Sequence, residues 1–218
     1  MRKLTIIQFL VCLTLTSIGQ IKPIDLKAIK KMSITADYKN LLDRFLANDT
    51  TLQLSDYQTI YYGQAFQTNY KPNARHDSIC ALHKYLNSSR DSVDFRKVLN
   101  YTKQILKDYP FNIEEIFITG IAYSNLGEED LSKVWFYKYD KLINTIMSSG
   151  DGKSEKTAFI VIKITDEYSL LNAFGFNFTG QSLVVNKKKS YDVMSVEQNN
   201  FGVESIYFDI NLFFGKWN

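Results

Sequence analysis

The feature that most constrains this chain is a change of hydrophobic period at a polar, glycine-bearing segment, residues 148–154. Before it, apolar residues recur at helical spacing, as in Tyr38, Leu41, Leu42, Phe45 and Leu46. After it, residues 204–214 alternate in the manner of a half-buried strand, with Ile206, Phe208, Ile210 and Leu212 on one face. We therefore expect an α+β fold, with helical hairpins over 20–150 packed on a small, mostly antiparallel sheet within 151–218.

Local signals divide the two regions into elements. The 3.6-residue period, helix caps and Pro110 predict helices over about 33–47, 56–66, 78–85, 91–108, 114–126 and 129–147. Pro23 argues against an earlier helix, and Ser55 is the expected cap of the second one. Beyond the boundary we expect strands over 157–165, 182–185, 191–196 and 204–214, with a short helix over 166–174 that Gly175 ends.

The N-terminus, residues 1–19, is typical of a secretory signal peptide. Arg2 and Lys3 are followed by the mostly apolar stretch 4–16, and Ser17 and Gly19 supply small residues for cleavage before Gln20. An uncleaved membrane anchor is the alternative, but the run is shorter than the roughly 20 apolar residues that a span needs. No other stretch reaches that length, so we expect an exported protein without a stable membrane span, in the periplasm or outside the cell.

Charge and cysteine usage narrow the class of the exported protein. The chain has 26 basic and 23 acidic residues, and loss of Arg2 and Lys3 leaves a net charge of about +1. This balance argues against a nucleic-acid partner. Loss of Cys12 leaves Cys80 as the single thiol, which excludes an intramolecular disulfide. Packing of the 14 tyrosines and 15 phenylalanines is the expected substitute.

Two segments carry candidate ligands. His76, Cys80 and His83 fall on one face of a predicted helix, so a zinc site is sterically conceivable, with Asp77 as the available fourth ligand. A buried thiol between boundary histidines is the simpler interpretation, and we predict no metal. Asp151, Gly152 and Ser154 lie in a sequence similar to the end of a phosphate-binding loop, but this segment follows a helix and precedes a strand. A flexible turn is expected there, and these three residues remain binding candidates.

The sequence also contains acidic pairs and one aromatic cluster. Glu114-Glu115, Glu128-Glu129 and Asp166-Glu167 stand at helix starts, where carboxylates favour the helix dipole. The aromatic cluster is expected to pack between helices, with a sugar- or peptide-contacting surface as the alternative; it comprises Tyr57, Tyr61, Tyr62, Phe66 and Tyr70. Because no nucleophile elbow or paired catalytic set is recognisable, we predict no catalytic residues and no cofactor.

The helices over 114–147 resemble one tetratricopeptide repeat. Small and aromatic residues stand at that repeat's spacings, namely Gly120, Tyr123, Gly127, Ser132 and Phe136, although Ile116 replaces the usual tryptophan. A helical hairpin that packs in this way without being such a repeat is the equal alternative, because the pattern is degenerate. The small residues would let the two helices cross closely. The resemblance implies a non-enzymatic module that binds protein or peptide through the helical part.

The mature chain as a whole resembles domain of unknown function 4919, a family of exported Bacteroidetes proteins. The resemblance is carried by residues 45–50 (FLANDT), 61–63 (YYG), 149–154 (SGDGKS), 157–159 (TAF) and 202–208 (GVESIYF). It implies a helical front and a β-rich back, and it brings no activity, ligand or site residue. The alternative function is therefore kept open: an envelope hydrolase that acts on glycan or peptide through Asp/Glu residues, for instance Asp151 or Asp209.

Three tripeptides are similar to a short O-glycosylation consensus of Bacteroidetes envelope proteins. They begin at Asp49, Asp77 and Asp91, and each falls in or beside a predicted loop.

Overall fold

A computed structural model describes residues 23–73, 76–89 and 92–214, so the predicted signal peptide, residues 1–19, lies outside the described residues. Seven helices come first in these ranges: α1 (Leu26–Met32), α2 (Ala36–Leu46), α3 (Leu54–Gln64), α4 (Asp77–Ser88), α5 (Phe95–Asp108), α6 (Ile113–Asn125) and α7 (Glu129–Met147). The C-terminal part contains β1 (Phe159–Ile160), α8 (Ile164–Phe174), β2 (Phe178–Asn186), β3 (Lys189–Val196) and β4 (Ser205–Asp209). The predicted α+β class is confirmed.

The expectation that Pro23 prevents an early helix is wrong. Helix α1 begins after Asp25, whose carboxylate accepts hydrogen bonds from the backbone amides of Lys27 and Ala28. Proline therefore lies ahead of the cap, where it interrupts no helical hydrogen bond. Ser55 is likewise not the cap of α3. The cap is Gln53, which forms a reciprocal capping box with Asp56 in the first turn of the helix.

Helices α6 and α7 form a closely packed hairpin, as the small residues predict. A Cβ atom at Gly120 would lie 2.9 Å from the ring of Phe136, and the Ser132 hydroxyl donates to the Gly120 carbonyl at 3.0 Å. Gly127 ends α6 in the left-handed region, with φ at +77°. The hairpin geometry is thus confirmed, and its assignment to the tetratricopeptide family stays a prediction.

The C-terminal sheet is mixed, in the order β1-β4-β3-β2. Strands β2, β3 and β4 pair antiparallel, whereas β1 pairs with β4 in parallel, with Phe159 opposite Phe208. The strand expected over 157–165 is much shorter, because the chain turns into α8 at Ile164. Its continuous apolar run suits a buried strand and a buried helix equally, and periodicity does not distinguish the two.

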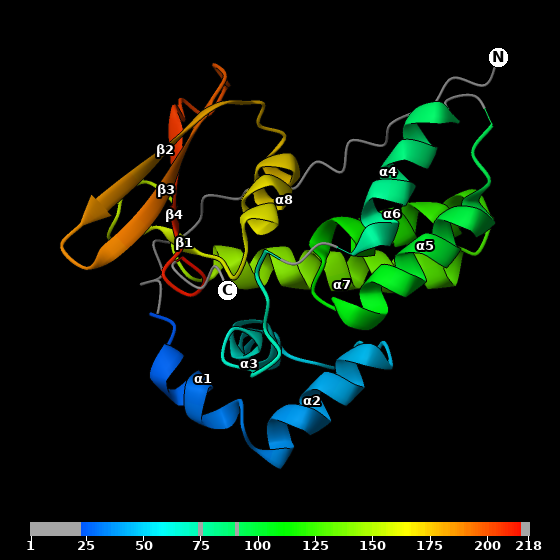
Figure 1. The fold of residues 1–218 in the computed structure, drawn as a ribbon, viewed down its shortest axis with the longest axis horizontal. Coiled ribbons are helices and arrows are strands. Elements are labelled where there is room, and N and C mark those ends of the chain that lie inside the picture. The colour runs from blue at the N-terminus through cyan, green and yellow to red at the C-terminus, as the bar shows by residue number, and fades with distance from the viewer. Residues whose placement is uncertain (1–22, 74–75, 90–91, 215–218) are drawn as a thin grey trace.

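One large apolar core joins the helices to the sheet. Tyr61 of α3, Ile146 of α7 and Phe208 of β4 belong to it and are fully buried. Figure 1 shows α7 running through the middle of the molecule, with α3 on one side and α8 on the other. Within the described ranges, no helix combines the length and apolarity that crossing a membrane requires.

Candidate functional site

A pocket of about 150 Å³ lies in the helical half. Four helices and the segment after α5 contribute its lining, which is formed by Phe45, Leu46, Thr102, Lys103, Leu106, Pro110, Thr119, Tyr123, Trp135 and Lys138. The floor is made of buried side chains such as Phe45 and Thr119, while Leu46 and Lys103 are exposed at the rim. A cavity of this size admits a group as large as a benzene ring.

Lys138 is the most unusual member of this lining. Its side chain is buried, with only 4% of the residue exposed. The ammonium donates to Asn48 Oδ1 at 2.8 Å and lies 4.1 Å from the Phe45 ring centroid and 4.6 Å from that of Trp135. Burial lowers the pKa of Lys138 to about 8. Two aromatic faces and one amide oxygen therefore stabilise a cation that has lost most of its water.

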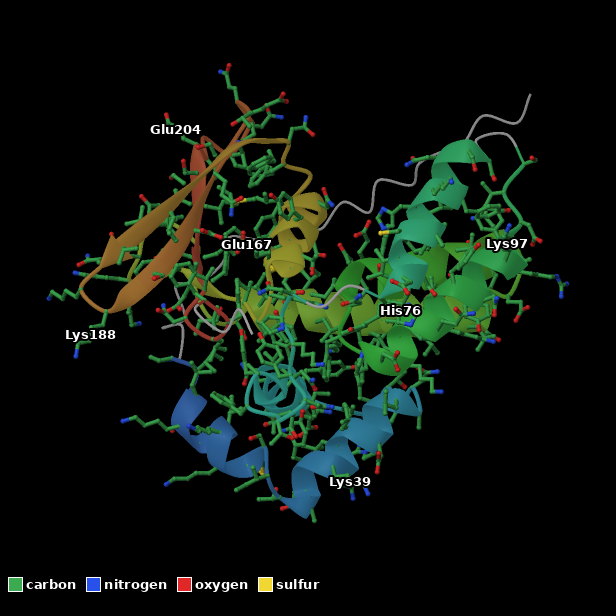
Figure 2. The ribbon with its side chains drawn as sticks, viewed as in Figure 1. Lys39, His76, Lys97, Glu167, Lys188 and Glu204 are labelled. Atoms are coloured by element: carbon green, nitrogen blue, oxygen red, sulfur yellow. The ribbon has the colours of Figure 1, made fainter. Side chains whose placement is uncertain are left out.

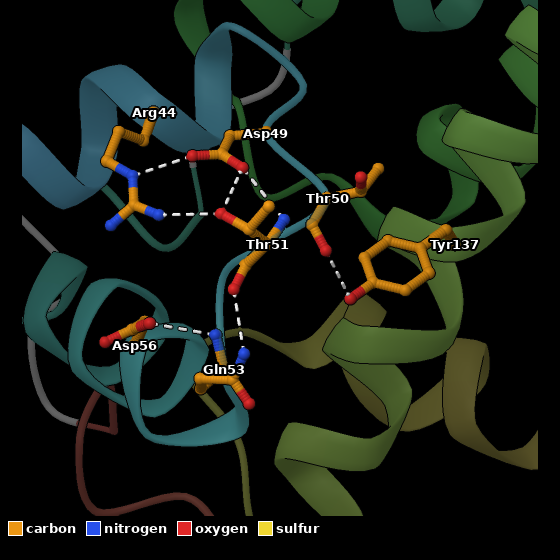
Figure 3. Close-up of polar contacts among 7 residues, drawn as sticks. All are labelled: Arg44, Asp49, Thr50, Thr51, Gln53, Asp56 and Tyr137. Carbon is orange, nitrogen blue, oxygen red and sulfur yellow. Dashed lines mark hydrogen bonds and ion pairs between the residues drawn. The ribbon is translucent and has the colours of Figure 1, made fainter.

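The loop after α2 holds Asn48 in place for this contact. The Asp49 carboxylate accepts from Arg44 Nε at 2.7 Å and from the Thr51 amide and hydroxyl at 2.8 and 2.7 Å, as Figure 3 shows. The Tyr137 hydroxyl donates to the Thr50 carbonyl at 2.8 Å. Tyr137 and Lys138 thus fasten the loop to α7 side by side, which fixes the distance between α2 and α7 across the pocket.

The electrostatics of the pocket favour an anionic group. Lys103 and Lys138 both line it, and none of its ten lining residues is acidic. The hydroxyls of Thr102 and Thr119 are already used, since they donate to the carbonyls of Leu99 and Glu115. The pocket therefore offers apolar walls and positive charge, an arrangement suited to an apolar group that carries a carboxylate.

A second polar feature is buried at the start of α8. Asp166 Oδ2 accepts the Tyr61 hydroxyl at 2.7 Å, and the buried carboxyl group of Glu167 interacts with that of Asp192. Glu167 lies between α8 and the sheet (Figure 2). Burial, together with the negative charges of Asp192 and Asp166, raises the pKa of Glu167 to about 9. This carboxyl group is therefore protonated at neutral pH.

Lys163 links this buried cluster to α6. It contacts the side chain of Asn112, which caps α6, and its charge acts on both Asp166 and Glu115. Burial raises the pKa of Asp166 to about 6, against the opposing effects of Lys163 and the Tyr61 hydroxyl. The arrangement therefore ties α3, α6 and α8 together.

The structure separates the three residues proposed as soft ligands. His76, labelled in Figure 2, caps α4, because its Nδ1 accepts from the Ser78 amide at 3.0 Å. Its Nε2 lies 3.4 Å from Asp108 Oδ2. Cys80 is exposed rather than buried, which corrects the expectation of a buried thiol. His83 faces α6, with Nε2 3.8 Å from Glu114 Oε1. The three candidate ligands therefore do not meet at one point: His76 lies beside one carboxylate, Asp108, and His83 lies beside two, Glu114 and Glu115.

The segment that holds Asp151, Gly152 and Ser154 is fastened by its own contacts. The amides of Asp151 and Gly152 both donate to the Thr157 carbonyl, at 2.9 and 2.8 Å, and the Ser154 hydroxyl lies 3.0 Å from that of Thr157. Gly152 has φ at +69°, and a Cβ atom there would lie 2.4 Å from the Phe159 ring. The segment is thus a tight connector between α7 and β1, and its binding role stays a prediction.

The structure also shows how exposed the aromatic cluster and the three tripeptides are. Tyr57, Tyr61 and Tyr62 are at most 1% exposed, which confirms core packing for these three, whereas Phe66 and Tyr70 are partly buried against the same core. In the first tripeptide Thr50 is exposed, whereas Ser78 of the second is buried and donates to Gln104 at 2.9 Å. Asp91 of the third lies outside the described residues.

Sequence reasoning missed Lys138, although one signal was present. Trp135, Leu142 and Ile146 of α7 follow helical spacing, and Lys138 stands in the same stripe. A lysine in an apolar stripe is either a snorkelling surface residue or a buried, partnered one, and only the contacts of Asn48 and Phe45 decide between them.

Comparison with known proteins identifies a family and no closer relative. The family model described as Domain of unknown function (DUF4919) matches residues 23–216, which include both the helical half and the sheet. No curated protein and no solved structure matches the chain. The match spans all of the described residues, including the pocket and the buried carboxylates. The chain therefore belongs to the family of domain of unknown function 4919.

Proposed function

We propose that this chain is an exported binding module whose helical pocket receives an apolar side chain next to a carboxylate, as at the C-terminus of a peptide or protein partner. The observation that carries the proposal is the pocket lined by Lys138, Trp135 and Phe45. Export rests on the predicted signal peptide, residues 1–19.

Size and charge support this choice of ligand. The volume of about 150 Å³ suits a single aromatic or large aliphatic side chain. A carboxylate beside it would be placed near the positive charges of Lys103 and Lys138. The lining contains no Asp or Glu, so the hydrolase alternative, which needs such residues beside its substrate, draws no support from this pocket. The small net charge gives no reason to include nucleic acid.

The proposal predicts that N-acetyl-phenylalanine binds the pocket. Trp135 serves as the fluorescence reporter in a chain in which Trp217, the other tryptophan, is replaced by Phe. For a ligand of this size we expect a Kd on the order of 1 mM. The variant Lys138→Met should weaken binding about fivefold to tenfold, because it removes the positive charge and keeps the apolar stem.

Matched controls separate binding from general effects. Lys133→Met removes an exposed positive charge from the same helix outside the pocket and should leave the Kd unchanged. N-acetyl-phenylalanine amide, which lacks the carboxylate, should bind about as weakly to the native chain as the acid binds to Lys138→Met. Equal binding of acid and amide would contradict the role of charge, and no fluorescence response to either would contradict the pocket as a binding site.

The same ligand is expected to bind in a pH-dependent way. Burial lowers the pKa of Lys138 to about 8, so the free pocket loses its buried positive charge above that pH. A bound carboxylate favours the ammonium and raises this pKa. Affinity should therefore be constant from pH 6 to 7.5 and fall as the pH rises through about 8 and beyond. Titrations across this range test the expectation, and an unchanged Kd at pH 9.5 would contradict it.

A further inference from the structure

A histidine and two carboxylates from distant segments meet between α4 and α6. One ligand atom from each of His83, Glu114 and Glu115 lies within 4.8 Å of the other two. His83 Nε2 is 3.8 Å from Glu114 Oε1, a separation too long for a hydrogen bond. Three potential ligand side chains therefore lie close together but form no direct hydrogen bond with one another.

The imidazole nitrogen at the centre of this group lacks a hydrogen-bond partner. Although 43% of the His83 side chain is exposed, its Nε2 atom is shielded from solvent, and no hydrogen bond reaches that atom from the described residues. Buried polar atoms are normally satisfied, and an unsatisfied one destabilises the fold. Glu115 beside it is only 3% exposed. This unpartnered nitrogen is an observation separate from the clustering, and it points to a ligand between the side chains.

The charges of the cluster favour a cation. Glu114 and Glu115 contribute two carboxylates, and their mutual repulsion adds to the burial that raises the pKa of Glu115. Lys163 and His83 both oppose the raised pKa of Glu115, but Lys163 also acts on Asp166. One ammonium is thus shared between two buried acids, and Glu114 adds a third carboxylate.

We infer that His83, Glu114 and Glu115 form a binding site for a divalent first-row transition metal ion such as Zn²⁺. Imidazole nitrogen and carboxylate oxygen bind zinc at about 2.0 to 2.2 Å, which places ligand atoms about 3.3 Å apart in a tetrahedron. The observed 3.8 Å between His83 and Glu114 needs only a small inward rotation of the half-exposed Glu114 side chain. Three protein ligands leave one position open to water or an exogenous ligand.

Such an ion would cross-link α4 to α6. Helix α4 is also held by Leu82, in a small apolar cluster with Val98 and Leu99 of α5, and by the hydrogen bond from Ser78 to Gln104. Metal bound only by the folded chain raises the midpoint of thermal unfolding. With Zn²⁺ at 100 times its Kd, the Tm should rise by about 5 °C or more.

The test is a calorimetric titration of Zn²⁺ into the tag-free, EDTA-treated full chain that carries Cys80→Ser, since the exposed thiol is itself a zinc ligand. We expect one equivalent of zinc per chain. Removing a residue that merely supports a ligand weakens metal binding about 10- to 100-fold, so His83→Asn should weaken it by about 100-fold or more. Glu114→Gln and Glu115→Gln should each weaken it as well.

A matched histidine and a spectroscopic readout make the result decisive. His76→Asn keeps an acceptor for the α4 cap and removes the only other imidazole, so stoichiometric binding should survive it. In the native chain, Zn²⁺ should shift the ring resonances of His83 and not those of His76, which requires no variant to fold. Absence of stoichiometric binding, its persistence in His83→Asn, or its loss in His76→Asn would each overturn the assignment.

Discussion

Replacing Asp166 by alanine is expected to lower the free energy of unfolding by about 2 to 4 kcal/mol. The substitution removes the acceptor of the Tyr61 hydroxyl, a 2.7 Å hydrogen bond between two residues with no exposed surface. It also leaves Lys163 with one fewer compensating carboxylate. A buried donor and a partly buried cation that lose their partner both destabilise the folded state.

Chemical denaturation monitored by circular dichroism gives the magnitude, and a double-mutant cycle with Tyr61→Phe assigns it. If the two side chains act on one another, the double variant should be less destabilised than the sum of the single variants by about 1 kcal/mol or more. Asp166→Asn keeps an acceptor for Tyr61 and should be milder. Thr165→Ala, at the exposed position next to it, should be nearly neutral. Full additivity of the two single changes would contradict the coupling.

The carboxylate pairs at the helix starts show that a sequence pattern can locate a helix terminus without predicting whether its side chains are buried. Each predicted pair does stand at the start of its helix, as the dipole argument requires, with Glu128 at the N-cap of α7 and the other members in first turns. Glu129 and Glu114 are exposed, whereas Glu115 and Asp166 are buried. The sequence pattern identifies the helix terminus, but the burial of each carboxylate depends on which distant element packs against that terminus. For Asp166 that element is α3, which lies about 100 residues earlier.

The fold itself was largely predictable because its signals are local. Helix α7 begins at Glu129 and ends at Met147, as the period and the preceding Gly127 predict. Alternation in β4 correctly places Ile206 and Phe208 on the buried face. The prediction was wrong where local signals conflict, as at the start of α8, where tertiary contacts decide between strand and helix.

The pocket could not be predicted, because no contiguous segment encodes it. Phe45, Thr102, Thr119 and Lys138 come from α2, α5, α6 and α7, and their juxtaposition depends on the loop contacts of Asn48 and Tyr137. The residues of the proposed metal site likewise come from segments that are distant in the sequence. His83 was recognised as a potential ligand, whereas its partners Glu114 and Glu115 were assigned only to the helix dipole.

Glu167→Gln is expected to stabilise the protein by about 2 to 4 kcal/mol at pH 8. The raised pKa of Glu167, about 9, means that the folded chain holds a proton that the unfolded chain releases near pH 4.5. Between these values the folded state binds more protons than the unfolded state, so stability falls as the pH rises. The glutamine variant has no proton to lose and offers its amide to the carboxylate of Asp192.

The useful window is pH 6 to 8, above the pKa of Asp166, about 6, and below that of Lys138, about 8. Across it the native chain should lose up to about 1.4 kcal/mol of stability per pH unit through Glu167, and the variant should lose much less. Urea denaturation at several pH values gives both slopes. Glu129→Gln, which neutralises an exposed carboxylate in the first turn of α7, is the matched control and should follow the native slope. If Glu167→Gln retained that slope too, the buried carboxyl group would not hold the proton, and Glu167 would be ionised against Asp192 in the folded chain.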